Sequence, residues 1–194
     1  MAKKKYTPSI FIRGESVNLI ALDEDLIDNS NWYKWFNDEK TTINTKYHVY
    51  PNTRELQKEF FKNNIKNNSS KIQLGVYHVH DEILIGVISL NNIDNFNKNC
   101  EFSAMLGEPK YQVLKYYLEA AKLIITHGFK SLGMQRIYSG TVKKEINDIV
   151  CRLLEFKPEG IKRSAIFKDG NFHNIYTHSI LQTEFLSSKE YNQK

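Results

Sequence analysis

The chain has 194 residues, 41% of them hydrophobic, and its 11 Phe, 11 Tyr and 2 Trp exclude a largely disordered protein. This length suits a single domain with a sizeable core. No apolar run approaches the roughly 18 residues of a membrane span, and the basic start has no apolar segment behind it, unlike a secretory signal. Cys100 and Cys151 have neither a disulfide nor a metal spacing. We therefore expect a cytoplasmic protein with no membrane partner.

The net charge of +5 points to an anionic partner. The 27 basic residues comprise 22 Lys and 5 Arg, scattered along the chain. Surfaces that bind nucleic acid favour the planar fork of Arg, so we expect no nucleic-acid partner. A small molecule that contains a nucleotide would use the same charge.

The first half of the chain alternates short strands with helices. A basic tail over residues 1–9 precedes a strand over 10–22 that is expected to kink at Gly14. Asp23 suits the start of a helix, and Thr53 is expected to cap a second helix. The inward-facing residues of that second helix are predicted to be Leu56, Phe60 and Phe61. Three strands follow, over residues 72–79, 83–90 and 100–106, the first two joined by a tight turn at Asp81-Glu82.

The second half has clearer periodicity. Apolar residues at helical spacing predict a helix that begins at Leu114 and is closed by Gly133. A strand, a short helix and a hairpin around Asp169-Gly170 complete the domain, which we place over residues 10–184, before a polar tail over 185–194. This order predicts a mixed α/β domain of the α+β type, with about seven strands in a largely antiparallel sheet and about four helices.

Several stretches, in this order, resemble the GNAT acetyltransferase superfamily, and specifically its RimJ/RimL-like branch. The similarity runs from about Ile12 to about Leu181. The matching stretches are Ile12-Arg13-Gly14, Trp35-Phe36-Asn37-Asp38, Leu84 to Leu90, Cys100 to Gly107, His127-Gly128-Phe129 and Phe156 to Gly160. The resemblance implies the GNAT fold, acetyl-CoA as co-substrate, transfer of its acetyl group to an amine, and no metal.

One departure concerns the loop that holds the pyrophosphate of the co-substrate. The family usually has glycines in a Q/R-x-x-G-x-G/A loop, whose backbone N–H groups cradle the pyrophosphate at a helix N-terminus. The matching stretch from Tyr111 to Tyr117 contains no glycine, so side chains there are expected to hinder a close approach or a positive φ. The resemblance places the co-substrate on Met105, Leu106, Lys110, Gln112, Val113, Leu114, Lys115, Tyr116 and Lys144, with a backbone N–H near Met105 and Leu106 polarising the thioester carbonyl.

Catalysis needs a base for the acceptor ammonium and an acid for the departing thiolate. Glu101 is the first candidate for the base, and its alternative is a solvated carboxylate at a strand end. Asp38 is a second candidate, with a helix cap as its alternative. The tyrosine that the family uses as an acid is replaced by Cys151, which is either a proton donor or a small buried hydrophobe.

The acceptor is expected to be an amino sugar carried on a nucleotide, because a basic surface suits such an anion. The residues that would bind it are Trp35, Asn37, Asp38, His48 and Tyr50. Two alternatives stay open: a RimJ/RimL-like enzyme that acetylates the terminal amine of a protein, and a GNAT-fold protein that binds without catalysis. A homodimer is compatible with each of them.

Overall fold

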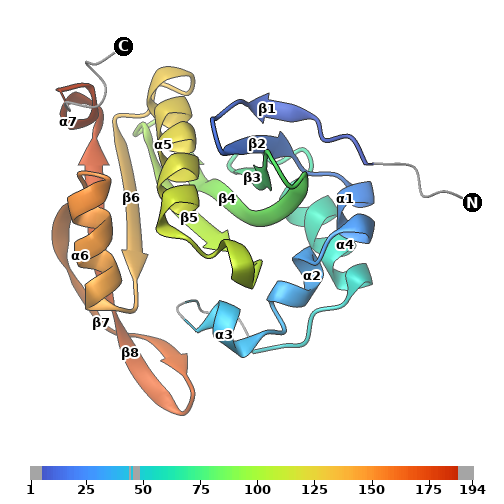
Figure 1. The fold of residues 1–194 in the computed structure, drawn as a ribbon. Helices are drawn as coiled ribbons and strands as arrows, with labels where there is room; N and C mark the ends of the chain where they lie inside the picture. Colours follow the sequence, from blue (N-terminus) through green and yellow to red (C-terminus); the bar gives the residue numbers. More distant parts are fainter. Residues whose placement is uncertain (1–5, 44, 46–48, 188–194) are drawn as a thin grey trace, which may run out of the picture.

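The computed structural model describes residues 6–43, 45 and 49–187 (Figure 1). Its centre is one eight-stranded sheet in the order β1-β2-β3-β4-β5-β6-β8-β7, in which only β5 and β6 run parallel. The strands are β1 (Ile10–Ile12), β2 (Val17–Ala21), β3 (Ile72–His78), β4 (Ile83–Asp94), β5 (Asn99–Leu106), β6 (Arg136–Thr141), β7 (Lys157–Lys168) and β8 (Asn171–Leu181). The predicted mixed, largely antiparallel α/β fold is therefore confirmed.

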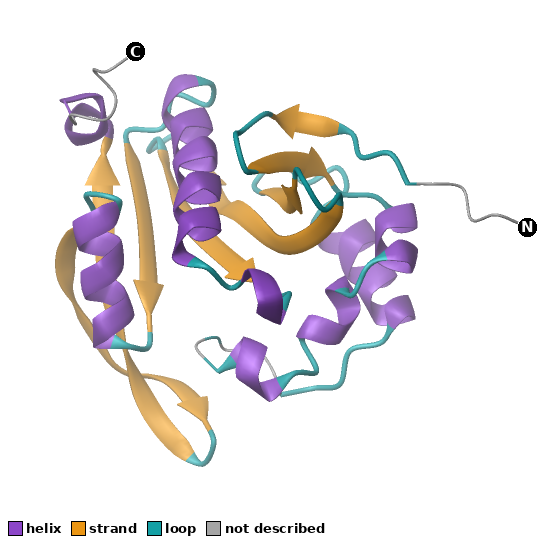
Figure 2. Ribbon diagram, in the orientation of Figure 1, coloured by secondary structure: helices purple, strands orange, loops and turns teal. Residues whose placement is uncertain are grey.

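Helices cover both faces of this sheet (Figure 2). The described residues form α1 (Glu24–Asn29), α2 (Trp32–Trp35), α3 (Glu39–Thr42), α4 (Arg54–Asn64), α5 (Leu114–Lys130), α6 (Lys144–Leu153) and α7 (Gln182–Ser187), with a 3-10 turn, η1 (Pro109–Tyr111). Four of the helices are six residues or shorter, which is why the helix count exceeds the expected four.

Two apolar cores lie on opposite faces of the sheet, because successive side chains of a strand point to opposite sides. Leu19 of β2 belongs to the core under α5 and α6, whereas the next residue, Ile20, belongs to the core under α1, α2 and α4. The buried face of α5 includes Ala121, Ile124 and Phe129, as its periodicity predicts. These cores fix the position of α5 on one side of β5 and of α2 on the other.

The N-terminal strand was predicted wrongly. Residues 10–22 do not form one kinked strand but a hairpin, in which Ile10 pairs with Ile20 and Ile12 with Leu19. The turn is held by Glu119 of α5, whose Oε1 accepts hydrogen bonds from the backbone N–H groups of residues 15, 16 and 17 at 2.6, 2.9 and 3.3 Å. The chain therefore reverses its direction after Gly14, and the turn is bound by a residue over a hundred positions later in the sequence.

Local predictions from turns and caps are confirmed. Thr53 caps α4 by accepting a hydrogen bond from the Leu56 N–H, at 3.2 Å. Asp169 and Gly170 both have positive φ, 51° and 77°, as a two-residue hairpin of this type requires. The expected inward face of α4 is wrong at Leu56, which is 46% exposed, because the helix buries Gln57 and Phe61 instead.

Contacts with the domain continue on both sides of residues 10–184. Helix α7 runs past residue 184, and the Phe185 ring lies 5.1 Å from that of Phe129. At the other end, Tyr6 donates a hydrogen bond to Asp23 at 2.9 Å, and the Ser9 carbonyl accepts one from Ala21. The ordered domain therefore takes in residues on both sides of the 10–184 range.

Candidate functional site

Strands β5 and β6 separate partway along their length. They pair only from Asn99 with Arg136 to Glu101 with Tyr138, whereas β5 stays paired with β4 up to Leu106. Beyond Glu101 the edge of β5 that faces β6 therefore has no ladder partner there, and Figure 1 shows the two strands diverging. Alternate residues of a strand direct their backbone groups to opposite edges, so N–H groups between Phe102 and Leu106 open into this gap. These are the groups that could polarise a carbonyl.

The loop from η1 into α5 lies at the end of the gap and can accept an anion. Val113 is the N-cap of α5, and no side chain caps the helix there. The Tyr116 amide donates to the Val113 carbonyl at 3.1 Å, so the amides that precede it in the first turn are the ones open to a ligand. Exposed lysines, Lys110 and Lys115, flank this turn. A pyrophosphate fits these residues, because the site combines free amides with positive charge.

The glycine-free loop adopts a backbone that ordinary residues allow. None of the residues from Gln112 to Tyr117 has a positive φ, so side chains are compatible with the backbone that the structure adopts. Val113 and Leu114 are about half exposed and point away from the core. Gln112 joins the loop to the end of β5, since its Nε2 donates to the Leu106 carbonyl at 3.1 Å. The hydroxyl of Tyr116 lies 3.2 Å from Nε2 of His78.

The end of β5 is connected to α2 by contacts among three residues, Trp35, Gly107 and Glu108. Trp35 is only 3% exposed, and a Cβ built on Gly107 would lie 1.9 Å from its Cδ2 atom. The indole therefore lies directly on Gly107. Glu108 Oε1 accepts hydrogen bonds from Trp35 Nε1 at 3.1 Å and from Asn31 Nδ2 at 2.9 Å. These bonds fix the Glu108 carboxylate just beyond the end of β5.

A pocket of about 320 Å³ opens beside these contacts. Its charged lining residues are Asp38, Glu108 and Lys34, so two carboxylates face it with one ammonium. Asp38 is the N-cap of α3, because its Oδ2 accepts hydrogen bonds from the N–H and the hydroxyl of Thr41 at 3.1 and 2.5 Å. The same bonds lower the pKa of its carboxyl, which is thus ionised at neutral pH. The capping alternative for Asp38 is therefore confirmed.

The other residues expected to bind the acceptor do not converge on this pocket. Asn37 exchanges two hydrogen bonds of 2.7 Å with the backbone of Asn52 and so secures the segment after α3. Tyr50 is 84% exposed. His48 lies outside the described residues.

The tip of the β7–β8 hairpin reaches the same region. Lys168 Nζ donates hydrogen bonds to the carbonyls of Thr42 and Thr45, at 2.7 and 3.1 Å. Figure 1 shows this hairpin extending below the sheet toward α3. One lysine thus joins the hairpin to the end of α3.

Glu101, the first candidate base, lies at the closed end of the gap. Its Oε2 accepts a hydrogen bond from Asn92 Nδ2 at 3.0 Å. Four residues of strand, roughly 13 Å, separate it from Met105. Glu101 therefore lies away from the open end of the gap, and its role as a base stays a prediction.

The candidate residues of α6 lie over β6 and β8. Cys151 is partly buried, and burial together with Asp148 raises the pKa of its thiol, which keeps its proton at neutral pH. Lys144 donates to Asp148 Oδ2 at 2.7 Å and is thereby paired within its own helix. Whether either residue meets the co-substrate stays a prediction.

A buried polar pair under α6 was missed by the sequence analysis. His178 of β8 is 2% exposed, and its Nδ1 lies 2.8 Å from Asn147 Oδ1. Burial lowers the pKa of His178 from 6.5 to about 4, so the ring is neutral near pH 7. A lone histidine in an alternating strand gives no signal that a helix residue 31 positions earlier is its partner.

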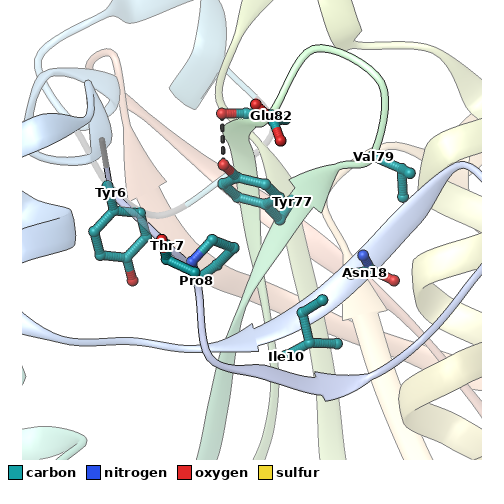
Figure 3. A pocket seen from close by; sticks show the side chains of 8 residues that line it. All are labelled: Tyr6, Thr7, Pro8, Ile10, Asn18, Tyr77, Val79 and Glu82. Carbon is teal, nitrogen blue, oxygen red and sulfur yellow. Dashed lines mark hydrogen bonds between the residues drawn. The ribbon is translucent and has the colours of Figure 1, made fainter. Parts of the chain in front are cut away.

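A second hollow, of about 310 Å³, lies between Tyr6, Asn18 and Tyr77 at the other end of the sheet (Figure 3). Its floor is fixed by the Tyr77 hydroxyl, which donates to the Glu82 carbonyl at 2.6 Å. Residues of β1, β2 and β3 are among its lining, and none of the candidate residues above is. Within the described part of the chain, no three His, Cys, Asp or Glu side chains gather as they would around a metal ion. In that same part, no helix has the length and apolarity that crossing a membrane requires.

Comparison with known families identifies the class of protein. The acetyltransferase (GNAT) domain matches residues 17–154, which is most of the chain and includes the gap, the α5 N-terminus and the pocket. The chain belongs to the GNAT acetyltransferase family.

Curated relatives match part of the chain. Spermidine N(1)-acetyltransferase of Escherichia coli K12 is 28% identical over 103 residues, which are 53% of this chain and 55% of that protein. "Putative ribosomal N-acetyltransferase YdaF" of Bacillus subtilis is 26% identical over 112 residues, 57% of this chain and 61% of that protein. The chain thus matches little more than half the length of these relatives.

Solved structures share the fold over nearly the whole chain. Spermidine N-acetyltransferase from Vibrio cholerae, in complex with CoA and spermine, superposes with a TM-score of 0.76 at 19% identity, covering 89% of this chain and 99% of that one. RimL, a ribosomal L7/L12 alpha-N-protein acetyltransferase in complex with CoA, gives 0.78 at 17% identity, covering 89% and 98%. At these identities the likeness shows that the GNAT fold is complete here.

Proposed function

We propose that this protein transfers an acetyl group from acetyl-CoA to a primary amine by direct attack in a ternary complex, and that the acceptor is a cationic aliphatic amine. Acetyl-CoA would supply the acetyl group as a thioester, with its pyrophosphate on the first turn of α5 between Lys110 and Lys115. Backbone N–H groups of β5 near Met105 and Leu106 would polarise the thioester carbonyl in the gap. Holding both substrates in one cleft supplies much of the acceleration.

The pair of carboxylates beside the end of β5 carries the acceptor part of the proposal. Glu108 stands two residues beyond Leu106, about 7 Å along the chain. Trp35 and Asn31 occupy Glu108 Oε1, which leaves Oε2 as an acceptor toward the pocket. A primary ammonium has donors for such an oxygen, and Asp38 adds a second negative charge for a second cationic group.

The same charges disfavour a nucleotide sugar. Its phosphates would meet two carboxylates and a single ammonium, Lys34, in this pocket. The relatives named above include enzymes for spermidine and for ribosomal protein, both of which present cationic amines. The basic surface of the chain, which first suggested a nucleotide-linked sugar, is accounted for by the phosphates of acetyl-CoA itself.

A measurement of CoA release tests the acceptor class directly. The purified protein is given acetyl-CoA with spermidine, with a lysine-rich peptide that has a free N-terminus, or with a uridine-diphosphate amino sugar, and the CoA thiol is titrated. We expect turnover with spermidine or the peptide and none with the nucleotide sugar. Turnover of the nucleotide sugar alone would overturn the cationic acceptor, and no turnover with any amine would overturn the transferase proposal.

Substitution of Glu108 tests the pocket. Glu108→Gln keeps an oxygen for Trp35 and Asn31 but removes the charge, so the KM for the cationic amine should rise about tenfold while the KM for acetyl-CoA stays constant. Glu145→Gln, at an exposed site on α6, is the matched control and should change neither value. Equal KM values for the amine in Glu108→Gln and the unaltered protein would remove Glu108 from the acceptor site.

Two proton-transfer roles belong to the same proposal. Glu101 would accept the proton of the acceptor ammonium through water, and Cys151 would protonate the departing thiolate. Glu101→Gln should then lower the rate at every pH where the carboxylate is ionised; an unchanged profile would exclude Glu101 as the base. The two thiols of the chain are unpaired, which supports a reducing, cytoplasmic location.

A further inference from the structure

Four side chains form a closed cluster beneath the first turn of α5. Tyr111 of η1 and Tyr116 of α5 come from the co-substrate side, and His78 and Asp81 come from the end of β3 and the turn after it. Tyr111 and His78 are each 7% exposed. The cluster therefore joins the loop that carries the α5 N-terminus to the interior of the sheet.

Each member of the cluster is bound to another. The Tyr111 hydroxyl donates to Asp81 Oδ2 at 2.5 Å. His78 is held from both sides, because its Nδ1 accepts from the Asp81 N–H at 3.1 Å and its Nε2 lies 3.2 Å from the Tyr116 hydroxyl. The His78 ring also packs against both tyrosine rings, with centroids 5.0 Å apart in each case.

The charge on Asp81 strengthens this arrangement. The hydrogen bond from Tyr111 is the largest of the causes that lower the pKa of the Asp81 carboxyl, so the carboxylate is ionised at neutral pH. A hydrogen bond to a charged acceptor is roughly twice as strong as one between neutral groups. Tyr111 is thus fixed by a charge-assisted bond as well as by burial.

The loop above this cluster lacks the glycines that would let its backbone adapt to a ligand. From Glu108 to His127 there is no glycine, and no residue from Gln112 to Tyr117 has a positive φ. Residues other than glycine rarely adopt a positive φ, so this loop cannot change to such a backbone when the ligand binds. Its backbone must therefore already have the binding geometry in the free protein. Tyr111 precedes the N-cap Val113 by two residues. The contacts of its side chain therefore fix the backbone that sets the direction of the first-turn amides.

We infer that Tyr111, anchored by Asp81 and His78, is a positioning residue that holds the first turn of α5 in place for the pyrophosphate of acetyl-CoA. The inference rests on the proposed use of acetyl-CoA. It assigns to this cluster, in which Tyr111 and His78 are buried, the preorganisation of a loop that has no glycine. Tyr111 itself touches neither substrate; it acts through the backbone of residues 112–116.

Tyr111→Phe tests the inference, because it removes one hydroxyl and keeps the ring. Loss of one charge-assisted bond should raise the Kd for CoA, measured by calorimetry, and the KM for acetyl-CoA by about tenfold, with kcat and the KM for the amine unchanged. Acetyl-pantetheine carries the same thioester without the pyrophosphate. Its kcat/KM should therefore stay within about twofold of that of the unaltered protein.

Two further variants separate positioning from general stability. Asp81→Asn keeps an acceptor oxygen for Tyr111 and should recover part of the CoA affinity that Asp81→Ala loses. Tyr6→Phe, which removes the bond from a tyrosine hydroxyl to Asp23 Oδ2 at 2.9 Å, away from the loop into α5, should leave the Kd for CoA unchanged. A merely structural role would instead lower the melting temperature and impair both thioesters alike.

The outcomes distinguish this inference from the proposed function. If the unaltered protein and Tyr111→Phe bind CoA equally well, or if the variant loses acetyl-CoA and acetyl-pantetheine equally, the inference is wrong and the transferase proposal stands. If the unaltered protein binds no CoA, both are wrong.

Discussion

The two sides of the cleft are built differently. On the co-substrate side, the loop into α5 is held by buried aromatic rings and by the bonds of Tyr111 to Asp81 and of Tyr116 to His78. On the acceptor side, α3 is four residues long, and its end is joined to the β7–β8 hairpin by Lys168. Strand β7 is exposed along nearly its whole length.

This difference suits the ligand that each side is proposed to bind. A co-substrate common to a family calls for a fixed platform, which buried contacts provide. Acceptors differ between relatives, and segments with few buried contacts can be altered without loss of the fold. We therefore expect changes on the acceptor side to alter specificity and changes on the co-substrate side to alter stability as well.

The largest effect is expected where the two sides meet, at Gly107. In Gly107→Ala the new methyl group would overlap the Trp35 indole, so one of two buried segments must move. We expect the free energy of unfolding to fall by roughly 3 kcal/mol or more, measured by urea denaturation. Gly133→Ala is the control: it has φ +66° but no neighbour within 4 Å, and it should cost roughly 1 kcal/mol. Similar losses in both variants would contradict the close packing of Trp35 on Gly107.

The next largest effect is expected from acid, which should lower the free energy of unfolding through the buried pair of His178 and Asn147 under α6. The folded-state pKa of His178, about 4, lies below its ordinary value of 6.5, so the unfolded chain takes up a proton first as the pH falls. Its contribution to stability is complete above pH 6.5 and declines between pH 6.5 and 4, by about 3 kcal/mol at most.

Unfolding free energies of the protein and of His178→Gln, measured from pH 7.5 to 4, check this effect. The variant lacks the titrating group, so its stability should fall less steeply in that window. Parallel curves would mean that His178 has the same pKa in the folded and the unfolded chain, and would contradict the shift that burial causes.

The smallest effect on stability is expected at Lys168. Lys168→Met keeps the length of the side chain but removes the bonds to the Thr42 and Thr45 carbonyls, at a cost below about 1 kcal/mol because the site is only partly buried. The KM for the amine should nevertheless change, with the KM for acetyl-CoA constant. Lys162→Met, on exposed β7, is the control. A change in the KM for acetyl-CoA would contradict the division between the two sides.

Much of the fold could be predicted from local patterns. The turn residues Asp169 and Gly170, the cap at Thr53 and the apolar face of α5 each follow from nearby sequence, and the structure confirms them. The reversal after Gly14 could not be predicted in this way, since it depends on Glu119 of a distant helix.

The candidate site divides along the same line. Asp38 was open between a base and a helix cap; its contacts with Thr41 show the cap, and its part in the acceptor site stays a prediction. Glu108 could not be predicted as a site residue from the sequence. Its carboxylate is positioned by hydrogen bonds from Trp35 and Asn31, more than 70 positions earlier. In the glycine-free loop, side chains were expected to hinder a close approach or a positive φ; the sequence shows which residues are missing but not the contacts of Tyr111 and Tyr116 beneath the loop.

The contact of Glu119 with the first turn has a consequence for how the chain folds during synthesis. The amides of residues 15–17 emerge from the ribosome early, but the carboxylate that binds them is made only after about a hundred further residues. Domains form during synthesis from the N-terminal end, and distant contacts are the slow ones. The N-terminal hairpin of this protein must therefore wait for α5, and its edge strand β1 stays without its final support until most of the sheet has been made.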